Sequence, residues 1–239
     1  MNRPFFGICL ALLLLPTLGC SNSPAEQSGA NSDNPLAVRI LPLGDSITQA
    51  NDKNMSYRYW LWDMLAEKKI AADFVGTQSS NYQGNPEFKD GFDTNHQGHW
   101  GWRSDEILSE LPEWLTHYDA DIALIHLGTN DCLKNQPVDE TLGELQQIVQ
   151  VLRSDNSSIS IAFSTLGPTS WQNFGCLAQI NQGLLQLQTD LNTTESQVIV
   201  VSPSQELQID SELYDGLHPN ALGEKKLANM WLRAIEILR

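Results

Sequence analysis

Short apolar stretches alternate with amphipathic ones along most of the chain. Five stretches have the length and composition of strands, at residues 37–41, 73–76, 121–127, 159–165 and 198–201. Helical spacing of apolar residues follows or separates them, at 56–69, 104–115, 138–153, 177–191 and 221–238. This alternation, with strands apolar enough to be covered on both faces, predicts a three-layer α/β/α sandwich around a mainly parallel sheet of about five strands. The absence of a second linker or a repeat favours one domain over residues 37–239.

Breaks in the pattern predict where these elements begin and end. Pro42 is expected to end the first strand, and Ser104 is expected to be the N-cap of its helix. Pro112 falls inside that helix and predicts a kink or a break. Residues 77–101 are rich in Asn, Gln, Gly and His and predict a long loop, which in a compact domain is usually functional or disordered.

The N-terminal segment resembles a targeting signal. Arg3 precedes an apolar run over residues 8–15, which is too short for the roughly 20 residues that span a bilayer. Gly19-Cys20 after such a run resembles the lipobox of bacterial lipoproteins, so we expect a signal peptide over 1–20 with Cys20 lipidated. An ordinary cleaved signal is the alternative. The polar residues 21–36 predict a flexible linker, and the domain is expected in the periplasm or at the cell surface.

Composition narrows the classes of partner. The chain has 14 basic and 29 acidic residues and a net charge of −15, which argues against a nucleic-acid binder. It fits an enzyme that acts on a small-molecule or polysaccharide substrate and meets a membrane only through a lipid anchor. Two cysteines lie outside the leader, Cys132 and Cys176. In an exported protein they are expected to form a disulfide, and two separate buried thiols are the alternative.

Three polar clusters stand where a parallel α/β sheet places its active site, after a strand or before a helix at the carboxyl edge. They are Gly44-Asp45-Ser46, Gly128-Thr129-Asn130-Asp131 and Asp215-Gly216-Leu217-His218-Pro219. Serine hydrolysis needs a hydroxyl, a base and a carboxylate that orients the base, and these clusters supply all three. Taken singly, each cluster is equally consistent with a solvated turn or a helix cap.

Together these clusters resemble three blocks of the SGNH/GDSL hydrolases, and residues 98–102, Gly-His-Trp-Gly-Trp, fill the position of the remaining block. The resemblance implies that Ser46 is the nucleophile, His218 the base and Asp215 the residue that orients it. It also implies an oxyanion hole formed by the backbone N–H of Ser46, a glycine N–H and the side-chain amide of Asn130. Gly101 is the expected glycine, with Gly98 as the second choice. No metal or organic cofactor is implied.

Further stretches resemble carbohydrate esterases such as acetylxylan esterases: Tyr57-Arg58-Tyr59-Trp60-Leu61-Trp62 and residues 96–102. The resemblance implies deacetylation of a carbohydrate. Asp45, Trp100 and Trp171 are expected to contact the substrate, and structural packing is the alternative for the two tryptophans. Other functions remain open: a lysophospholipase-like or thioesterase-like lipid hydrolase, a sugar O-acyltransferase, or a non-catalytic carbohydrate-binding lipoprotein.

Three histidines outside the triad require a separate interpretation. His96 and His99 have a spacing that could begin a metal site, but the sequence offers no third ligand cluster, so polar contacts in the loop are expected instead. His126 falls within the apolar stretch 121–127 and is expected to be a hydrogen-bonded histidine of the core.

Overall fold

The computed structural model describes residues 37–172, 175–203 and 207–239. The expected signal peptide, Cys20 and the linker over 21–36 lie outside these residues. None of the helices in the described ranges is long and apolar enough to span a bilayer.

The described chain contains one parallel sheet. Its strands are β1 Val38–Gly44, β2 Ala72–Phe74, β3 Gln97–Gly98, β4 Ile122–His126, β5 Ser160–Ser164 and β6 Val198–Val201. Their order is β2-β1-β4-β5-β6, with the short β3 also paired to β1 beyond the end of β2, and every pairing is parallel. The prediction of a mainly parallel sheet is confirmed, and β3 adds a strand within the segment expected to be a loop.

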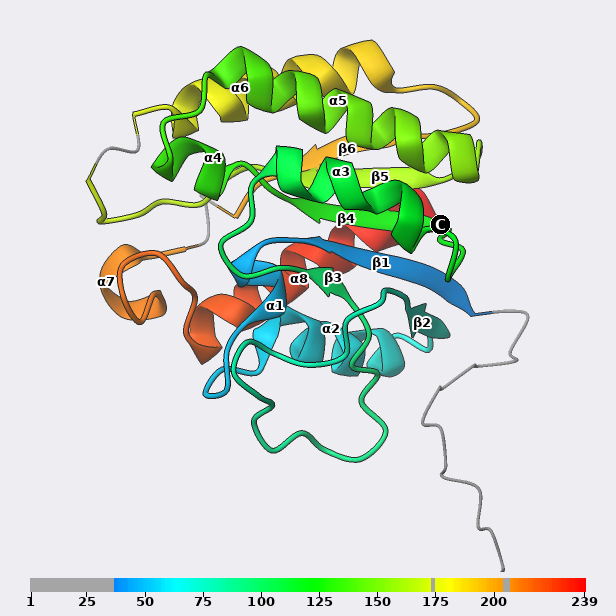
Figure 1. Cartoon of the computed structure of the whole chain (residues 1–239). Helices are drawn as coiled ribbons and strands as arrows, with labels where there is room; N and C mark the ends of the chain where they lie inside the picture. The colour runs from blue at the N-terminus through cyan, green and yellow to red at the C-terminus, as the bar shows by residue number, and fades with distance from the viewer. Residues whose placement is uncertain (1–36, 173–174, 204–206) are drawn as a thin grey trace, which may run out of the picture. The chain divides into compact units, whose positions relative to one another are not determined.

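Helices cover both faces of the sheet, which confirms the three-layer prediction. Their bounds are α1 Ser46–Gln49, α2 Ser56–Glu67, α3 Ser104–Trp114, α4 Thr129–Leu133, α5 Val138–Asp155, α6 Leu177–Leu191, α7 Ile209–Glu212 and α8 Ala221–Leu238. Figure 1 shows α3, α5 and α6 on one side of the strands and α2 and α8 on the other. Each side has its own hydrophobic core, so the sheet is buried on both faces.

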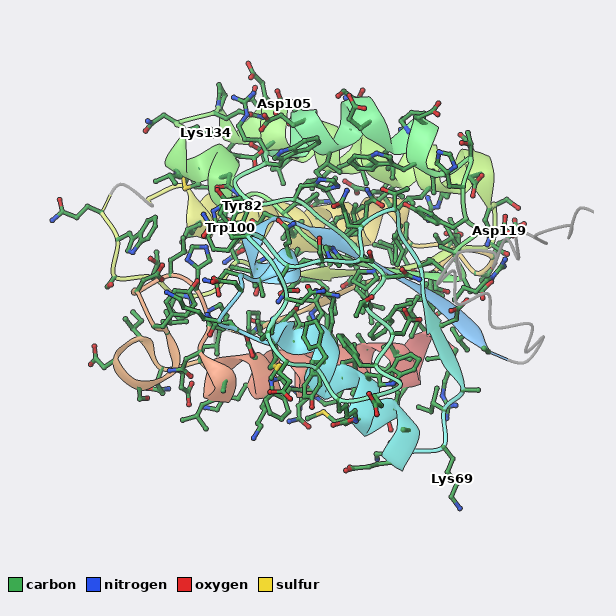
Figure 2. All side chains as sticks on the ribbon, turned by 60° about the horizontal axis from the view of Figure 1, so that its bottom comes forward. Lys69, Tyr82, Trp100, Asp105, Asp119 and Lys134 are labelled. Atoms are coloured by element: carbon green, nitrogen blue, oxygen red, sulfur yellow. A yellow bond between two sulfur atoms is a disulfide. The ribbon has the colours of Figure 1, made fainter. Side chains whose placement is uncertain are left out.

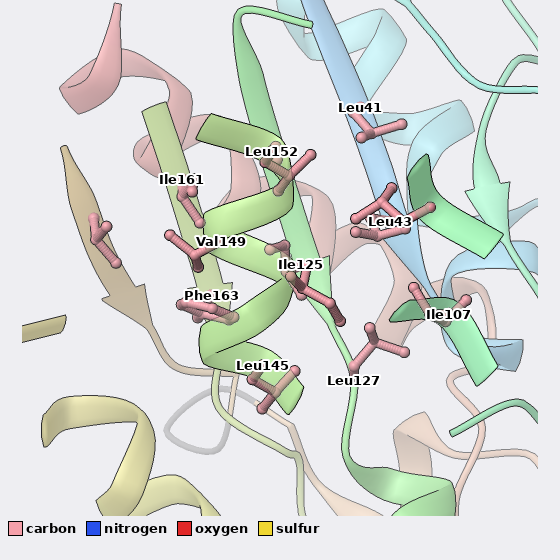
Figure 3. Packing of buried hydrophobic residues seen from close by; sticks show 14 of the residues in the cluster. Leu41, Leu43, Ile107, Ile125, Leu127, Leu145, Val149, Leu152, Ile161 and Phe163 are labelled. Carbon is pink, nitrogen blue, oxygen red and sulfur yellow. The ribbon is translucent and has the colours of Figure 1, made fainter. Parts of the chain in front are cut away.

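The helical spacing of apolar residues accounts for the first core. Leu145, Val149 and Leu152 of α5 lie on one stripe of the helix and are fully buried. In Figure 3 they lie over the sheet beside Ile161 and Phe163 of β5. On the other face, Tyr57 of α2 packs against Trp231 of α8 with ring centroids 5.9 Å apart.

Two sequence-based boundaries are wrong. β1 continues through Pro42 to Gly44, because proline removes one hydrogen-bond donor but has a φ compatible with an extended strand. The N-cap of α3 is Arg103, and Ser104 is the first helical residue. The hydroxyl of Ser104 instead hydrogen-bonds the buried carboxylate of Asp131, so tertiary contacts use the side chain that the sequence assigned to the cap. α3 runs through Pro112 and ends two residues later.

A disulfide joins Cys132, at the end of α4, to Cys176, which precedes α6. The two Cα atoms are 5.8 Å apart and 44 residues apart in the sequence. The bond therefore fixes the turn after β4 to the segment that leads into α6. Both segments border the carboxyl edge of the sheet.

Candidate active site

The three polar clusters meet at the carboxyl edge of the sheet. β1 and β4 end side by side, with Gly44 paired to His126, and the turns that follow them carry Ser46 and Asn130. Asp45 begins α1 as its N-cap, its carboxylate accepting the backbone N–H of Ile47 at 2.9 Å. This cap starts the short helix at Ser46 and directs the serine out of the strand.

Ser46, His218 and Asp215 form a continuous hydrogen-bonded chain. The Oγ of Ser46 lies 2.9 Å from Nε2 of His218, and Nδ1 of His218 lies 2.7 Å from Oδ2 of Asp215. A carboxylate facing Nδ1 requires a proton there, which leaves Nε2 free to accept from the serine hydroxyl. Ser46 is 6% exposed and His218 is 7% exposed, so both lie in a nearly closed site that a substrate can still reach.

The surroundings of Asp215 keep its carboxylate ionised. Burial alone would raise its pKa, but the backbone N–H of His218, the His218 imidazole and the backbone N–H of Leu217 outweigh this effect and hold the pKa below its ordinary value. The two N–H donors lie 2.8 and 3.0 Å from Oδ1, so Oδ2 is left for the imidazole. The turn over residues 215–218 therefore orients the carboxylate before it meets the ring.

Asn130 lies beside the hydrogen-bonded residues Ser46, His218 and Asp215, on the turn after β4. Its Nδ2 donates to the backbone oxygen of Trp102 at 2.9 Å and has a looser contact of 3.4 Å with Oδ2 of Asp45. The first bond fixes the direction of the amide group. The contact with Asp45 is long and therefore weak, so this N–H of Asn130 can donate instead to a negatively charged oxygen beside Ser46.

The two candidate glycines have different surroundings. The N–H of Gly98 donates to Nδ1 of His96 at 2.9 Å, and a Cβ at this position would lie 2.6 Å from the backbone nitrogen of Gln49. Gly98 is therefore a packing glycine with an occupied N–H. Gly101 has a φ of +79° and open space around its Cβ position, and its N–H makes no hydrogen bond to any described residue. The structure thus favours Gly101 as the available donor.

Asp45 is not positioned to contact a substrate, and that expectation is wrong. Its side chain is completely buried and caps α1. Burial raises the pKa of this carboxyl to about 7 despite the hydrogen bond from Ile47. The Gly-Asp-Ser motif thus uses its aspartate to build the nucleophile turn and to contact Asn130.

Aromatic rings surround His218. Trp100 stacks on its imidazole with centroids 4.9 Å apart, and Trp171 meets it edge-on at 6.1 Å. Two further aromatic rings, which were not predicted from the sequence, also lie here. Tyr214 stacks on His218 at 5.6 Å. Tyr82 stacks on Trp100 at 4.8 Å, and the two lie next to each other in Figure 2. One signal was available in the sequence, the position of Tyr214 directly before the Asp-x-x-His motif.

His96 and His99 are neutral structural groups. His96 is fully buried, accepts the Gly98 N–H and contacts the backbone oxygen of Ser80, and burial lowers its pKa well below the ordinary value. His99 stacks on two tryptophans, and burial lowers its pKa to about 4. No cluster of three or more metal-ligating side chains occurs in the described parts of the chain.

His126 departs from its expected environment. It is 2% exposed, as a core residue should be, and burial lowers its pKa to about 4. Its Nδ1 has no hydrogen-bond partner among the residues that the structure describes, and the carboxylate of Asp45 lies 4.0 Å away. The expectation of a hydrogen-bonded core histidine is therefore wrong at this atom.

A small pocket opens beside the hydrogen-bonded chain. It contains about 220 Å³ of empty space, counting the part open to solvent. It is lined by Ser46, Ile47, Ala50, Asn54, Tyr214, His218, Pro219 and Glu224. The serine hydroxyl thus borders a space suited to a small group.

Comparison with known proteins identifies relatives among esterases. A family model described as GDSL-like lipase/acylhydrolase matches residues 43–226. A multidomain esterase of Ruminococcus flavefaciens is 28% identical over 255 residues, which cover 96% of this chain and 32% of that protein. The chain therefore spans about a third of the length of this relative.

Solved structures with the same fold include carbohydrate esterases. A family 3 carbohydrate esterase from Talaromyces cellulolyticus and an acetyl esterase crystallised with an acetate ion each have a TM-score of 0.75 and 26% identity, covering 84% of this chain and 98% of theirs. A family 3 carbohydrate esterase from Clostridium thermocellum has a TM-score of 0.71 and 26% identity over 85% of this chain and 98% of its own. The chain is thus a carboxylic ester hydrolase and belongs to the GDSL-like lipase/acylhydrolase family.

Proposed function

We propose that this esterase removes acetyl groups from a carbohydrate through an acyl-enzyme on Ser46. The observation that carries the proposal is the unbroken chain from Asp215 through His218 to Ser46, with contacts of 2.7 and 2.9 Å. Such a chain allows the imidazole to take the hydroxyl proton while the carboxylate stabilises the imidazolium that forms.

The reaction proceeds in two halves. Ser46 Oγ attacks the ester carbonyl carbon as its proton passes to Nε2 of His218, and the resulting tetrahedral intermediate collapses when Nε2 returns that proton to the departing sugar oxygen. A water molecule then attacks the acetyl-serine, with Nε2 again taking a proton. Acetate leaves, Oγ regains its proton, and the site returns to its starting state.

The negatively charged oxygen of each tetrahedral intermediate is bound by three donors. They are the backbone N–H groups of Ser46 and Gly101 and the Nδ2 of Asn130. The N–H of Gly101, which has no partner in the described part of the chain, and the oriented amide of Asn130 support this assignment. Each donor of this kind typically lowers the barrier by about 2.7–4 kcal/mol.

An acetyl group is the proposed acyl group because the pocket beside Ser46, which Glu224 and Tyr214 help to line, is small. The structural likeness to an acetyl esterase and to family 3 carbohydrate esterases, at 26% identity, supports the same choice. A series of p-nitrophenyl esters tests it. We expect activity to fall steeply beyond the acetyl ester, whereas a preference for long acyl chains would exclude a small acyl group.

A carbohydrate is the proposed alcohol because exposed aromatic rings border the site. Tyr82, Trp171 and Tyr214 are 40%, 37% and 43% exposed, and Trp100 connects the first of them to His218. Aromatic faces of this kind can pack against the C–H surfaces of sugars, while hydroxyl and indole N–H groups supply hydrogen bonds.

The decisive comparison is acetate release from acetylated xylan against fatty-acid release from phospholipid. We expect acetate release from xylan and no fatty-acid release from phospholipid. The Ser46→Ala variant should release no acetate. Release from phospholipid alone would instead establish a lipid hydrolase. Transfer of acetyl to an added sugar in preference to water would establish an acyltransferase, and xylan binding without turnover would establish a carbohydrate-binding protein.

We also propose that the domain is exported and anchored through a lipidated Cys20. The Gly19-Cys20 pair after an apolar run and the disulfide of the domain, which is typical of oxidising compartments, support this location. Mass spectrometry of the mature N-terminus tests it: a diacylglyceryl group on Cys20 is expected, and an unmodified N-terminus at another residue would overturn it.

A further inference from the structure

Arg58 of α2 is buried behind the nucleophile turn. It is 1% exposed and makes no ion pair with any residue in the described chain. Its guanidinium donates to oxygen atoms, which are the backbone oxygens of Thr48 at 3.0 Å, Gln49 at 3.2 Å and Thr94 at 2.9 Å and Oδ1 of Asn81 at 2.9 Å. All four acceptors are carbonyl oxygens, and three of them belong to the backbone. Arg58 therefore holds segments of the backbone together.

The four acceptors belong to two segments that both border the active site. Two of them form the carboxyl end of α1, the helix that begins at Ser46. The other two belong to the segment over residues 77–101, which carries Gly101 and Trp100. A direct contact also links the segments, since Oε1 of Gln49 accepts the backbone N–H of Trp100 at 2.7 Å.

α1 needs such support because it is only four residues long. Few backbone hydrogen bonds hold this helix. The one at its carboxyl end runs from the N–H of Ala50 to the oxygen of Ser46 at 2.8 Å. Helices this short are not stable alone. Forming the first helical turn costs free energy, and only the residues added after it stabilise the helix. External donors at its carboxyl end therefore determine where the helix lies.

We propose that Arg58 is a positioning residue that holds α1 and the 77–101 segment in one fixed relation, so that the N–H groups of Ser46 and Gly101 converge on the same oxygen. Since this requires Ser46 to be the nucleophile, the role of Arg58 rests on the proposed function. An arginine suits it because its planar fork presents five donors at fixed angles, whereas lysine offers a single ammonium.

The charge of Arg58 is compatible with this role at neutral pH. Burial lowers the pKa of its guanidinium to about 10, and the negative charges of Tyr57, Asp93 and Glu224 act in the opposite direction when these groups are ionised. The group therefore stays protonated at neutral pH, and its donors remain in place.

The test is Arg58→Lys, with Arg153→Lys as the matched control. Arg153 also donates to backbone oxygens, those of Leu191 at 2.6 Å and Ser196 at 2.9 Å, but it joins α5 to the end of α6 and to the residues before β6. Both variants are expected to lower Tm. Only Arg58→Lys is expected to lower kcat, by about 10–100-fold with KM little changed, since a small misplacement of reacting groups has an effect of this size. A kcat within about twofold of the parent in Arg58→Lys would overturn the inference.

A second variant covers the case in which Arg58→Lys does not fold. Asn81→Ala removes one acceptor of the guanidinium, along with donations to the backbone oxygens of Asn51 and Asn54, and is expected to lower kcat in the same direction by a smaller factor. An unchanged kcat there would also contradict the role. Labelling of the parent by a fluorophosphonate separates this inference from the proposed function: absence of label on Ser46 would refute the nucleophile, whereas labelling with an unaltered Arg58→Lys rate would refute only the positioning.

Discussion

Trp100 stacks on His218 with an angle of 17° between the ring planes and 4.9 Å between their centroids. Asp215 orients the same imidazole through Nδ1 within its plane. The aromatic contact limits tilting of the ring out of that plane, which a single hydrogen bond cannot do. Trp100 therefore helps to orient the base in addition to bordering the substrate site.

Replacing Trp100 tests this contribution. Trp100→Ala is expected to lower kcat/KM by about 10-fold, because a stacked aromatic pair contributes about 0.5–1.5 kcal/mol beyond its buried area. Trp100→Phe keeps a ring over the imidazole and is expected to retain most of the activity. Steady-state kinetics on p-nitrophenyl acetate distinguish the two variants, and equal losses in both would argue against a stacking role.

Asp215→Asn tests the orientation of His218. The substituted amide can offer an N–H to Nδ1, which favours the wrong tautomer, so kcat is expected to fall by about 10³–10⁴-fold. The variant keeps the shape of the turn, and circular dichroism should show an unaltered fold. A loss of less than about tenfold would mean that the carboxylate is dispensable.

Asn130→Ala removes the proposed side-chain donor to the oxyanion. We expect kcat to fall by about 10²–10³-fold, the effect typical of losing one such donor. Asn156→Ala is the control, since that side chain donates to the backbone oxygen of Ala120 at the opposite end of β4. If both variants retain parental kcat, the amide of Asn130 serves the fold alone.

His96 predicts a pH dependence of stability. Its pKa is held well below 6.5, first by burial and then by the charge of Arg58, so the unfolded chain binds a proton that the folded chain does not. The stability that it contributes is present above pH 6.5 and is lost as the pH falls, at up to about 1.4 kcal/mol per pH unit.

The check is urea unfolding of the parent and of His96→Asn at pH 7 and pH 5. Asparagine can accept the Gly98 N–H but cannot be protonated, so the parent is expected to lose more stability on acidification than the variant. Other titrating groups are shared by the two proteins and cancel in the difference. Parallel pH profiles would contradict the assignment.

The layers of this fold could be predicted from the sequence because its strands and helices differ in period and length. The stretch 121–127 became β4 with every strand residue buried, as its composition predicts. The predictions are wrong where the local sequence favours one structure but tertiary contacts impose another. Ser104 has the chemistry of an N-cap but is used by Asp131, and β3 forms only because Gly98 can approach α1 closely.

The site was predictable in part. Ser46, Asn130, Asp215 and His218 stand in the order of a known family, and the structure brings them together. The roles of Arg58 and Tyr82 could not be predicted, because the residues that they contact, such as Thr94 and Trp100, are distant in sequence. Tyr214 lies only four residues before His218, but nothing in the sequence shows that the two rings stack. Asp45 was misassigned because a residue beside the nucleophile is as well placed to cap its helix as to meet a substrate, and only burial distinguishes the two.

Trapping the acyl-enzyme tests the central claim most directly. The parent and Ser46→Ala would be mixed with p-nitrophenyl acetate, quenched in acid before the steady state and digested for mass spectrometry. We predict an acetyl group on Ser46 in the parent and none at any residue in the variant, which should also lack turnover. Turnover by Ser46→Ala, or stoichiometric acetylation of the parent at a residue other than Ser46, would contradict the account.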